Sequence, residues 1–344
     1  MKLSVVIICW NDFKVIQDCL KSIFAEPLSF DFEVIISDNG STDPSIPFVK
    51  EHYPRVKVVE NGANLGFAKG NNAGIRAASG EYVLILNPDT IIHGKSLESF
   101  VAFAQNHPKA GAFGCRVLNR DGSDQNPARP LPTVHGYLIA ALGLRFLAKF
   151  SKAFESDKYL NWDGLSEKEI GFQSGCCVMV RNELLSQLEG FDERFFYHFE
   201  ETDLCFRVWK SGRSILFCPD AVITHLGGQS VGRFPVRFAL ETYRSRYRYF
   251  FKHYGESGAR QIRLVSLVSL AIRCCGYSLI NALKPREAVK NRLFCDRALL
   301  AWNWRLDPLR FIKEGAEPES GYEPLAPAPV MTEWGGICHG QRSS

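Results

Sequence analysis

The sequence predicts an α/β fold with a mostly parallel central sheet, helices on both faces and a helical C-terminal region. Two observations support this prediction. In the first 120 residues or so, short apolar runs alternate with segments whose apolar residues recur every three to four positions. Strands that alternate with helices favour parallel pairing, because each crossover helix returns the chain to the same end of the sheet. From about residue 236 to 303, only helical patterns remain.

The strands expected in the first part are continuous apolar runs, as buried parallel strands require. They lie at 3–10, 32–38, 55–61 and 81–89. A helix is expected after the first strand, where "NDFKVIQDCLKSIF" places its apolar residues on one helical face, and another at about 66–79.

The second part of the chain begins with a less regular segment. Residues 118–172 lose the alternation and contain three prolines early on, which predicts a long and partly irregular insertion. A strand at 175–181 and a short helix at 182–188 follow, and then a loop that enters a helix near residue 200. The stretch "RSILFCPDAVITH" is expected to form two short strands broken at Pro219.

Composition excludes several classes of protein. A formal net charge of +4 over 344 residues is too small and too dispersed to indicate nucleic-acid binding by itself. The eleven cysteines are odd in number, irregularly spaced and without a CxxC pair, so reduced cysteines in a cytosolic protein are predicted. The N-terminal apolar run is too short for a signal peptide and has no small-residue cleavage site.

The most apolar stretch of the chain is 262–284, which Arg263 and Arg273 interrupt. It therefore falls short of a clean membrane span. We expect an amphipathic helix that packs on the body of the protein or lies on a membrane surface. The tail at 315–344 is rich in Pro, Gly, Glu and Ser and is predicted to be disordered.

Three polar loops follow predicted strands: "ICWND", "SDNGSTD" and "LNPDT". In open α/β sheets, ligands bind beyond the carboxyl ends of the strands. In "SDNGSTD", Asp38 can accept hydrogen bonds from a ribose or a base edge. The alternative is a helix-capping turn that uses Ser41, Thr42 or Asp43.

Two further loops each allow two interpretations. In "NPDT", the carboxylate of Asp89 suits a divalent cation that bridges to nucleotide phosphates, while the alternative is a β-turn or helix cap. The helix entry "NLGFAKGNNAG" favours an anion, with Lys69 nearby, while the alternative is close helix–strand packing at its glycines. The chain has no GxGxxG, and "GKS" at 94–96 lacks the first glycine of a P-loop.

The stretch "FYHFEETDLC" crowds Glu200, Glu201 and Asp203 beside aromatic residues. If a helix starts near residue 200, Glu200 and Asp203 share a face and Glu201 is turned by roughly 100°. Crowding against aromatics should raise the pKa of one carboxyl toward neutrality, as a general base requires. The alternative is that these carboxylates only favour the helix dipole. His198 is either a neighbour of the base or a core histidine.

Six segments, in order, resemble one known family: "SVVIICWN", "SDNGSTD", "NLGFAKGNNAGI", "LNPDT", "GFDERFFYHFEETDLCFR" and "ITHLGGQS". Together they resemble the inverting glycosyltransferases of family 2, and within it the rhamnosyltransferase-like branch, over residues 3–254. The resemblance implies a GT-A fold. Its nucleotide-sugar-binding half would be 1–117, its acceptor-binding and catalytic half 118–235, and a membrane-associated helical region 236–314.

The resemblance also implies residue roles. Asp38 would contact the nucleoside, Asp89 would be the last aspartate of a DxD motif with Asn87 in its first position, and His225 would complete the metal site or contact the diphosphate. Mg²⁺ or Mn²⁺ is the implied cofactor. The residues expected to bind the donor are Cys9, Asn11, Asp38, Asn39, Asn64, Gly66, Lys69, Asn87 and Arg244.

The acidic group takes the catalytic role in this resemblance. Glu201 would remove the proton of the acceptor hydroxyl, with Glu200 and Asp203 beside it, although the family usually has Asp where this chain has Glu201. Arg244 and its neighbours Arg246 and Arg248 would neutralise phosphates of the donor or of a lipid-linked acceptor. A nucleic-acid surface and an ordinary solvated helix face are the alternatives for this arginine-rich stretch.

The resulting functional prediction is a cytoplasmic enzyme, peripheral at the inner face of the cell membrane. It would transfer a sugar, with rhamnose as the first candidate, from a dTDP- or UDP-sugar to a cell-surface glycan or lipid-linked oligosaccharide. Two alternatives stay open. A sugar nucleotidyltransferase would need a glycine-rich basic loop after the first strand, which "ICWNDFKV" does not provide. The other is a non-catalytic glycan- or nucleotide-binding subunit of an assembly complex.

Overall fold

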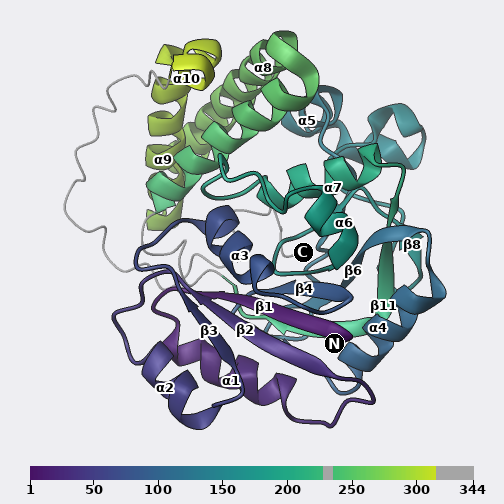
Figure 1. The fold of residues 1–344 in the computed structure, drawn as a ribbon. Coiled ribbons are helices and arrows are strands. Elements are labelled where there is room, and N and C mark those ends of the chain that lie inside the picture. The colour runs from purple at the N-terminus through teal and green to yellow at the C-terminus, as the bar shows by residue number, and fades with distance from the viewer. Residues whose placement is uncertain (228–234, 315–344) are drawn as a thin grey trace. The chain divides into compact units, whose positions relative to one another are not determined.

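The computed structural model describes residues 1–227 and 235–314 (Figure 1). The chain divides into two compact units. The first, here called the sheet unit, comprises 1–131 and 158–227. The second, the helical unit, comprises 132–157 and the chain from residue 228 onward. The segment 132–157 therefore groups with the C-terminal helices, whereas the sequence resemblance assigns it to the acceptor-binding half.

Within the described residues, one nine-stranded sheet forms the centre of the sheet unit. Its order is β3-β2-β1-β4-β10-β6-β11-β5, with β8 paired to β11. The strands are β1 (Leu3–Cys9), β2 (Phe32–Asp38), β3 (Lys57–Glu60), β4 (Tyr82–Leu86), β5 (Thr90–Ile92), β6 (Ala110–Leu118), β8 (Lys168–Glu169), β10 (Cys177–Arg181) and β11 (Ser214–His225). Strands β1, β2, β3, β4, β6 and β11 run in one direction, and the pairings of β5, β8 and β10 are antiparallel. The mostly parallel sheet is confirmed. Two short strands, β7 (Ala128–Arg129) and β9 (Phe172–Gln173), pair separately.

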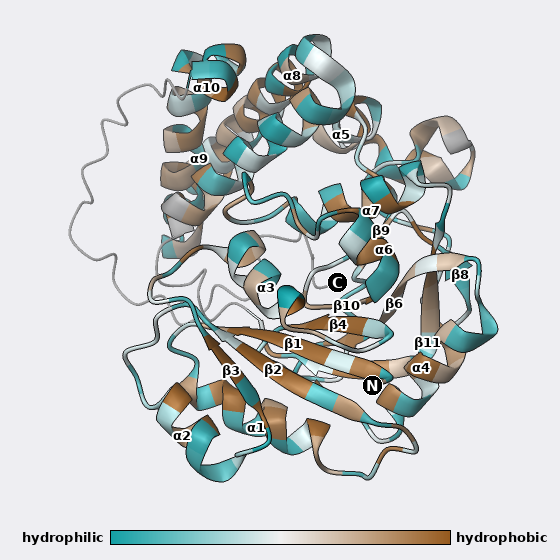
Figure 2. Cartoon of the chain, in the orientation of Figure 1, coloured by the Kyte–Doolittle hydropathy of each residue, from teal (hydrophilic) through white to brown (hydrophobic). Residues whose placement is uncertain are grey.

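Alternating side chains of the strands divide the core into two layers. Val5 and Ile7 of β1 belong to one hydrophobic cluster, with α1 (Phe13–Ile23), α2 (Ser45–His52) and α4 (Ser96–Asn106). Val6 belongs to the other cluster. The helices of that second layer are α3 (Phe67–Arg76), α6 (Asn182–Gln187) and α7 (Glu200–Lys210). Helices on both faces are therefore confirmed, and the strands of the sheet unit are largely hydrophobic (Figure 2).

The helical unit contains α5 (Val134–Ala141), the 3₁₀ turns η1 (Leu144–Lys149) and η2 (Lys152–Phe154), α8 (Pro235–Leu283), α9 (Glu287–Arg305) and α10 (Pro308–Glu314). Helix α8 breaks at Gly255, whose φ is 68° and ψ −166°. The buried Tyr247 hydroxyl donates a hydrogen bond to Asn303, and Arg273 pairs with Asp296, so polar contacts as well as apolar packing join α8 to α9. Among the described helices, Phe238–Leu283 is long and apolar enough to cross a membrane by length and composition.

One local expectation needs correction. The stretch expected as two strands broken at Pro219 is one strand, β11. Its register with β6 shifts between Cys218 and Val222, and this irregularity accommodates a proline, which has no N–H to donate. The insertion at 118–172 is partly irregular, as expected: it contains α5, two 3₁₀ turns and short strands, separated by segments such as 119–127 and 155–167 that form no helix or strand. The tail at 315–344 and the end of "ITHLGGQS" lie outside the described residues.

Candidate functional site

The carboxyl ends of β1 and β2 lie side by side, because the parallel register pairs Cys9 with Asp38. Asp38 is buried, and its carboxylate accepts a hydrogen bond of 3.0 Å from the backbone N–H of Ser41. The backbone N–H of Asn39 donates to the carbonyl of Cys9 at 2.8 Å. Burial raises the pKa of the Cys9 thiol to about 12, so this side chain stays neutral at physiological pH. The hydrogen bond from Ser41 to Asp38 helps to close the turn that follows β2.

Asn11 organises the neighbouring loop. Its φ is 58°, a left-handed conformation that asparagine tolerates better than most residues. Its side-chain oxygen accepts hydrogen bonds from the backbone N–H groups of Thr42 (2.8 Å) and Asp43 (3.1 Å). Asp43 in turn accepts from the N–H and hydroxyl of Ser45 at the start of α2. The capping-turn alternative therefore describes Asp43. The contacts of Asn11 additionally join the loop after β1 to the loop after β2.

A network of asparagines holds the entry to α3. The amide nitrogen of buried Asn39 donates to the carbonyl of Gly66 at 3.1 Å, and Asn64 accepts from the N–H of Gly66 at 3.0 Å. Gly66 has φ 81°, and a Cβ there would lie 2.7 Å from the ring of Phe196. The alternative of close helix–strand packing holds at Gly70 and Gly74, where a Cβ would lie 2.5 Å from Ile8 and Val6 of β1, respectively. Lys69 is exposed on the same helix.

Asp89 and His225 lie close together beside β5, the last strand in the sheet order, because β5 and β11 pair Thr90 with His225. The carboxylate oxygen Oδ1 of Asp89 lies 3.3 Å from Nε2 of His225. The amide nitrogen of Asn87 lies 3.4 Å from the same ring nitrogen. The other ring nitrogen, Nδ1, faces the side-chain oxygen of Gln125 at 3.1 Å. A carboxylate, an imidazole and an amide thus converge.

These groups fit a hard divalent cation. The buried Oδ1 of Asn87 has no hydrogen-bond partner, and amide oxygens are ligands for Mg²⁺ and Mn²⁺. Two ligands of one such ion, each about 2.1 Å from the metal, are separated by roughly 3 Å, close to the distance between Asp89 and His225. No cluster of three His, Cys, Asp or Glu side chains with metal-site geometry occurs in the described residues. Such an ion would therefore take its further ligands from phosphates and water.

The acidic pair lies at the start of α7. Two consecutive residues before it, His198 and Phe199, have φ of 63° and 68°. Left-handed conformations cost on the order of 1–3 kcal/mol each in non-glycine residues, and strain of this kind concentrates at functional sites. Glu200 and Glu201 are the first two residues of the helix. The left-handed residues therefore set the direction in which α7 begins, and with it the placement of both carboxyl groups.

The pKa values of both carboxyl groups are raised above their usual range. Burial, followed by the charge of Glu201, raises the pKa of Glu200 well above its usual range. Burial raises the pKa of Glu201 to about 7, although backbone N–H groups, including that of Gly175, favour its charged form. The side chain of Glu201 is half-buried, but its Oε2 is enclosed and has no hydrogen-bond partner, as is Oε2 of Glu200. A carboxyl with a pKa near 7 can take up a proton at neutral pH.

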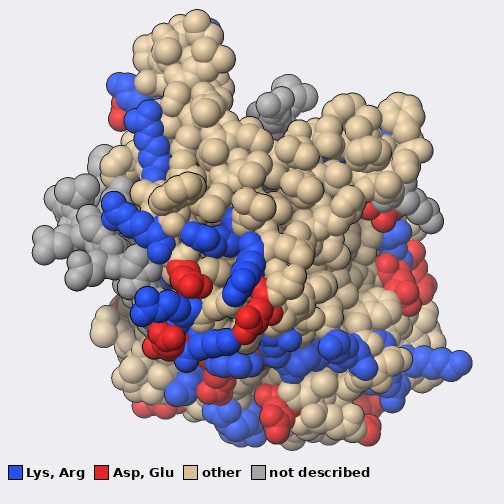
Figure 3. Space-filling view, turned by 90° about the horizontal axis from the view of Figure 1, so that it is seen from above, with Lys and Arg blue, Asp and Glu red and all other residues tan. Residues whose placement is uncertain are grey.

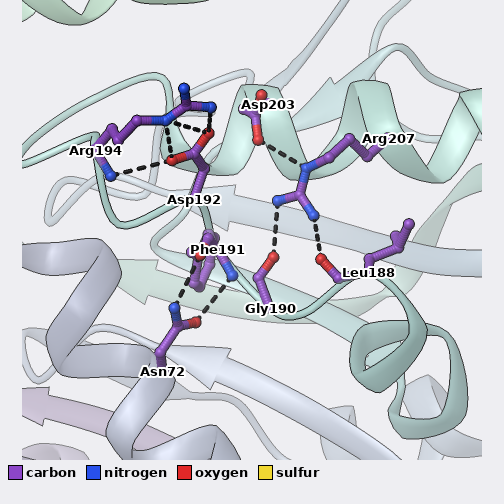
Figure 4. Close-up of polar contacts among 8 residues, drawn as sticks. All are labelled: Asn72, Leu188, Gly190, Phe191, Asp192, Arg194, Asp203 and Arg207. Carbon is purple, nitrogen blue, oxygen red and sulfur yellow. Dashed lines mark hydrogen bonds and ion pairs between the residues drawn. The ribbon is translucent and has the colours of Figure 1, made fainter.

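Asp203 has a different environment. Its side chain is completely buried, and it accepts a hydrogen bond of 2.8 Å from Nε of Arg207. The same guanidinium donates to the carbonyls of Leu188 (2.6 Å) and Gly190 (2.7 Å), as Figure 4 shows. The carboxylate of Asp203 therefore belongs to the network that anchors the loop before α7. Its spacing of four residues from Arg207 on one helix is the local sequence signal that could have indicated this pair.

The loop between α6 and α7 has a second anchor, Asn72 of α3. Its side-chain oxygen accepts from the N–H of Phe191 at 2.9 Å, and its nitrogen donates to the carbonyl of Phe191 at 2.8 Å (Figure 4). The side chain of Asn72 thus makes the same pair of hydrogen bonds to Phe191 that a neighbouring backbone would make in a sheet, although the two residues are 119 positions apart. Sequence reasoning placed Asn72 only within a glycine- and asparagine-rich helix entry and gave Gln125 no role, because neither residue has a local signal.

Three arginines of α8, Arg244, Arg246 and Arg248, contact aromatic rings within the helical unit. Arg244 also pairs with Glu241, and its guanidinium lies 5.7 Å from the ring centre of Trp302. Arg246 lies over Tyr137 and Arg248 over Phe311, at 4.7 and 4.8 Å. Packing thus accounts for part of the arginine–aromatic pattern. On the face seen in Figure 3, Lys and Arg are interspersed with Asp and Glu, which does not favour a nucleic-acid surface.

Comparison with known proteins gives a consistent result. The family model described as "Glycosyl transferase family 2" matches residues 4–188. The chain is 30% identical over 254 residues to the N-acetylglucosaminyl-diphospho-decaprenol L-rhamnosyltransferase of Mycobacterium tuberculosis, covering 70% of this chain and 81% of that protein. It is 24% identical over 215 residues to rhamnosyltransferase WbbL of Escherichia coli, covering 59% of this chain and 76% of that protein.

Solved structures show the same fold. The mannosyltransferase PcManGT from Pyrobaculum calidifontis, in complex with GDP-Man and Mn²⁺, aligns with a TM-score of 0.55 at 16% identity. This alignment covers 92% of our chain and 88% of that structure. The expected GT-A fold is therefore confirmed, as is the resemblance to the rhamnosyltransferase-like branch. The chain belongs to glycosyl transferase family 2 and is a glycosyltransferase.

Proposed function

We propose that this enzyme transfers a sugar, with rhamnose as the first candidate, from a nucleoside diphosphate donor to a glycan or lipid-linked acceptor with inversion at the anomeric carbon. The observation that carries the proposal is Glu201, whose enclosed, unpartnered carboxylate oxygen has the pKa of a general base at neutral pH. The choice of rhamnose rests on the relative that is 30% identical and named as an L-rhamnosyltransferase.

In the proposed reaction, Glu201 accepts the proton of the acceptor hydroxyl while the hydroxyl oxygen forms a bond to the anomeric carbon. The bond between that carbon and the diphosphate oxygen breaks on the opposite face, and its electron pair leaves with the nucleoside diphosphate. Burial raises the pKa of Glu200, which favours the neutral form of this second carboxyl and so limits its repulsion of the ionised Glu201 that takes up the proton. We assign Asp203 to anchoring the loop instead of proton transfer.

The donor would lie along the sheet edge formed by the loops after β1 and β2. Asp38 would face the nucleoside, with Cys9, Asn11 and Asn39 alongside, while Asn64, Gly66 and Lys69 would lie nearer the phosphates. Asp89, His225 and Asn87 would hold Mg²⁺ or Mn²⁺, which when bound supplies positive charge to the leaving diphosphate. A role of Arg244 toward phosphate is proposed on the resemblance alone.

Membrane contact is part of the proposal. The last half of α8 exposes several large apolar side chains, with Leu279 62% and Leu283 77% exposed, and Lys284 and Arg286 follow directly. An apolar helix face with basic residues at its end suits the surface of an anionic bilayer. The named substrate of the M. tuberculosis relative is carried on decaprenol diphosphate, which favours the same location for this enzyme.

The test compares Glu201→Gln with the matched control Glu183→Gln, which removes an exposed carboxylate from the first turn of α6. Turnover of dTDP-rhamnose and UDP-sugars should fall by about 10²- to 10⁴-fold in Glu201→Gln only. The shift in melting temperature caused by dTDP or UDP with Mn²⁺ should be unchanged in both variants, because donor binding does not require the base. Equal turnover in Glu201→Gln and wild type would contradict the assignment. Nucleotide binding by a wild-type protein that has no turnover would favour the non-catalytic alternative.

A further inference from the structure

Gln125 contacts His225 twice, although the two residues are 100 positions apart. Its side-chain nitrogen donates to the backbone carbonyl of His225 at 2.7 Å. Its side-chain oxygen lies 3.1 Å from the ring nitrogen Nδ1 of the same histidine. A carbonyl can only accept a hydrogen bond, so the first contact determines which end of the amide is the nitrogen. The oxygen of Gln125 must then be the atom that faces Nδ1.

This orientation determines the protonation of the ring. An amide oxygen is only an acceptor, so Nδ1 has to carry the hydrogen. In a neutral imidazole, the proton on Nδ1 leaves Nε2 with a lone pair that can accept a hydrogen bond, as from Asn87 here, or bind a cation. That nitrogen is the one that lies 3.3 Å from the carboxylate of Asp89 and 3.4 Å from the amide nitrogen of Asn87. The lone pair is therefore directed to where a cation would bind.

Gln125 is itself held in place by the hairpin that follows β6. Its backbone N–H donates to the carbonyl of Val117 at 2.9 Å. The preceding residue, Asp124, accepts two parallel hydrogen bonds from the guanidinium of Arg116, at 2.9 and 2.8 Å. Such a bidentate pair restricts both side chains and stiffens the hairpin. Gln125 thus extends from a supported element toward the ring of His225.

We propose that Gln125 is a positioning residue that holds His225 as the Nδ1–H tautomer and presents Nε2 as a ligand for the divalent cation. Histidines that bind metals generally donate their second ring N–H to a neighbouring acceptor, and loss of that acceptor typically weakens metal binding about 10- to 100-fold. The inference rests on the proposed metal role of Asp89 and His225. It adds a residue that determines how well His225 can serve in that role.

The first measurement is the tautomer of His225 in the full chain without metal, by NMR of protein labelled with ¹⁵N-histidine. The His225→Gln variant identifies the signals. We expect wild type to show a protonated Nδ1 and an unprotonated Nε2. In Gln125→Leu, which removes the acceptor that faces Nδ1, the population should shift toward protonated Nε2. A protonated Nε2 in wild type, or the same tautomer in wild type and Gln125→Leu, would overturn the proposal.

The second measurement is the affinity for Mn²⁺ in the presence of dTDP or UDP, followed by electron paramagnetic resonance. Gln125→Leu should bind Mn²⁺ about 10- to 100-fold more weakly than wild type. The matched control, Gln17→Leu, removes a single hydrogen bond from a glutamine to a backbone carbonyl in α1 and should leave Mn²⁺ affinity unchanged. Unchanged affinity in Gln125→Leu would overturn the ligand-presenting role. Absence of Mn²⁺ binding by wild type would refute the metal role of Asp89 and His225, whereas the tautomer result would still test the contact with Gln125.

Discussion

The guanidinium of Arg207 donates a hydrogen bond of 2.8 Å to the completely buried carboxylate of Asp203, one helical turn earlier on α7. The same guanidinium binds two backbone carbonyls of the preceding loop. A neighbouring pair of the same residue types, Arg194 and Asp192 (Figure 4), is less deeply buried: the side chain of the arginine is 71% exposed and that of the aspartate 11%. The side chains of Arg207 and Asp203 are 17% and 0% exposed, so this pair is the one that is shielded from water.

We expect Arg207→Met to destabilise the protein by about 3–5 kcal/mol, because it removes the guanidinium that pairs with the completely buried carboxylate of Asp203. The matched control, Arg310→Met, breaks a pair with Glu314 that has the same four-residue spacing but exposed side chains (67% and 57%), and it should cost no more than about 1 kcal/mol. Urea denaturation of both variants measures the difference. Equal losses of stability would show that Arg207 does not compensate a buried charge.

Catalysis should depend on the ionisation of Glu201. A base must be deprotonated to accept a proton, and the pKa of Glu201 is about 7. We therefore expect kcat/KM to rise with pH through about 7 and to level off above it, and the residual activity of Glu201→Gln to lack this rise. Initial rates with saturating metal, measured across neutral pH, test this. A wild-type profile that is flat there would exclude Glu201 as the titrating base.

The free energy of unfolding should also depend on the ionisation of Glu201, but it should fall over the pH range in which activity rises. The pKa of Glu201 is higher in the folded state than the ordinary value of 4.5, so between these values the folded protein binds more protons than the unfolded chain. The free energy of unfolding of wild type should therefore fall as pH rises from about 4.5 through 7. Glu201→Gln lacks this titration and should gain on the order of 1–3 kcal/mol over wild type across that interval. Parallel stability curves for the two proteins would contradict the raised pKa.

Gly190 should tolerate no side chain. Its φ is 68°, and a Cβ there would lie 2.5 Å from the side-chain oxygen of Asn72, which anchors Phe191. Gly212 has a similar φ of 80°, but a Cβ at that position would have nothing within 4 Å, and so it serves as the control. Gly212→Ala should cost about 1 kcal/mol from backbone strain alone, and Gly190→Ala at least about 2 kcal/mol because the anchor must also move. Chemical denaturation compares the two variants, and equal costs would argue against the anchoring role of Asn72.

Membrane contact through α8 can be tested with vesicles. Replacing Leu279 and Leu283 together by Asp should reduce co-sedimentation with anionic phosphatidylglycerol vesicles at least about tenfold, because apolar burial and charge attraction are both weakened. Leu165→Asp changes an exposed leucine of the sheet unit (57% exposed) and should leave binding unchanged. Vesicle binding that is equal in the double variant and in wild type would place the contact elsewhere.

Much of the fold could be predicted from local pattern. The strand at 32–38 was predicted with the same bounds as β2, and the helices near 66–79 and 200 correspond to α3 and α7. One prediction failed where tertiary contacts override local signals. Strand β11 continues past Pro219 because its partner β6 extends along both sides of the irregularity.

Local patterns of a few residues are enough to predict the alternation of strands and helices, the loops at the strand ends and the acidic group at Glu200 and Glu201. What those residues can do depends on the groups that the fold packs around them. Only folding brings Gln125 to His225 and encloses Glu201 enough to raise its pKa to about 7. The physical reason is that tautomer choice and desolvation depend on the groups packed around a side chain, and most of those groups come from distant parts of the chain.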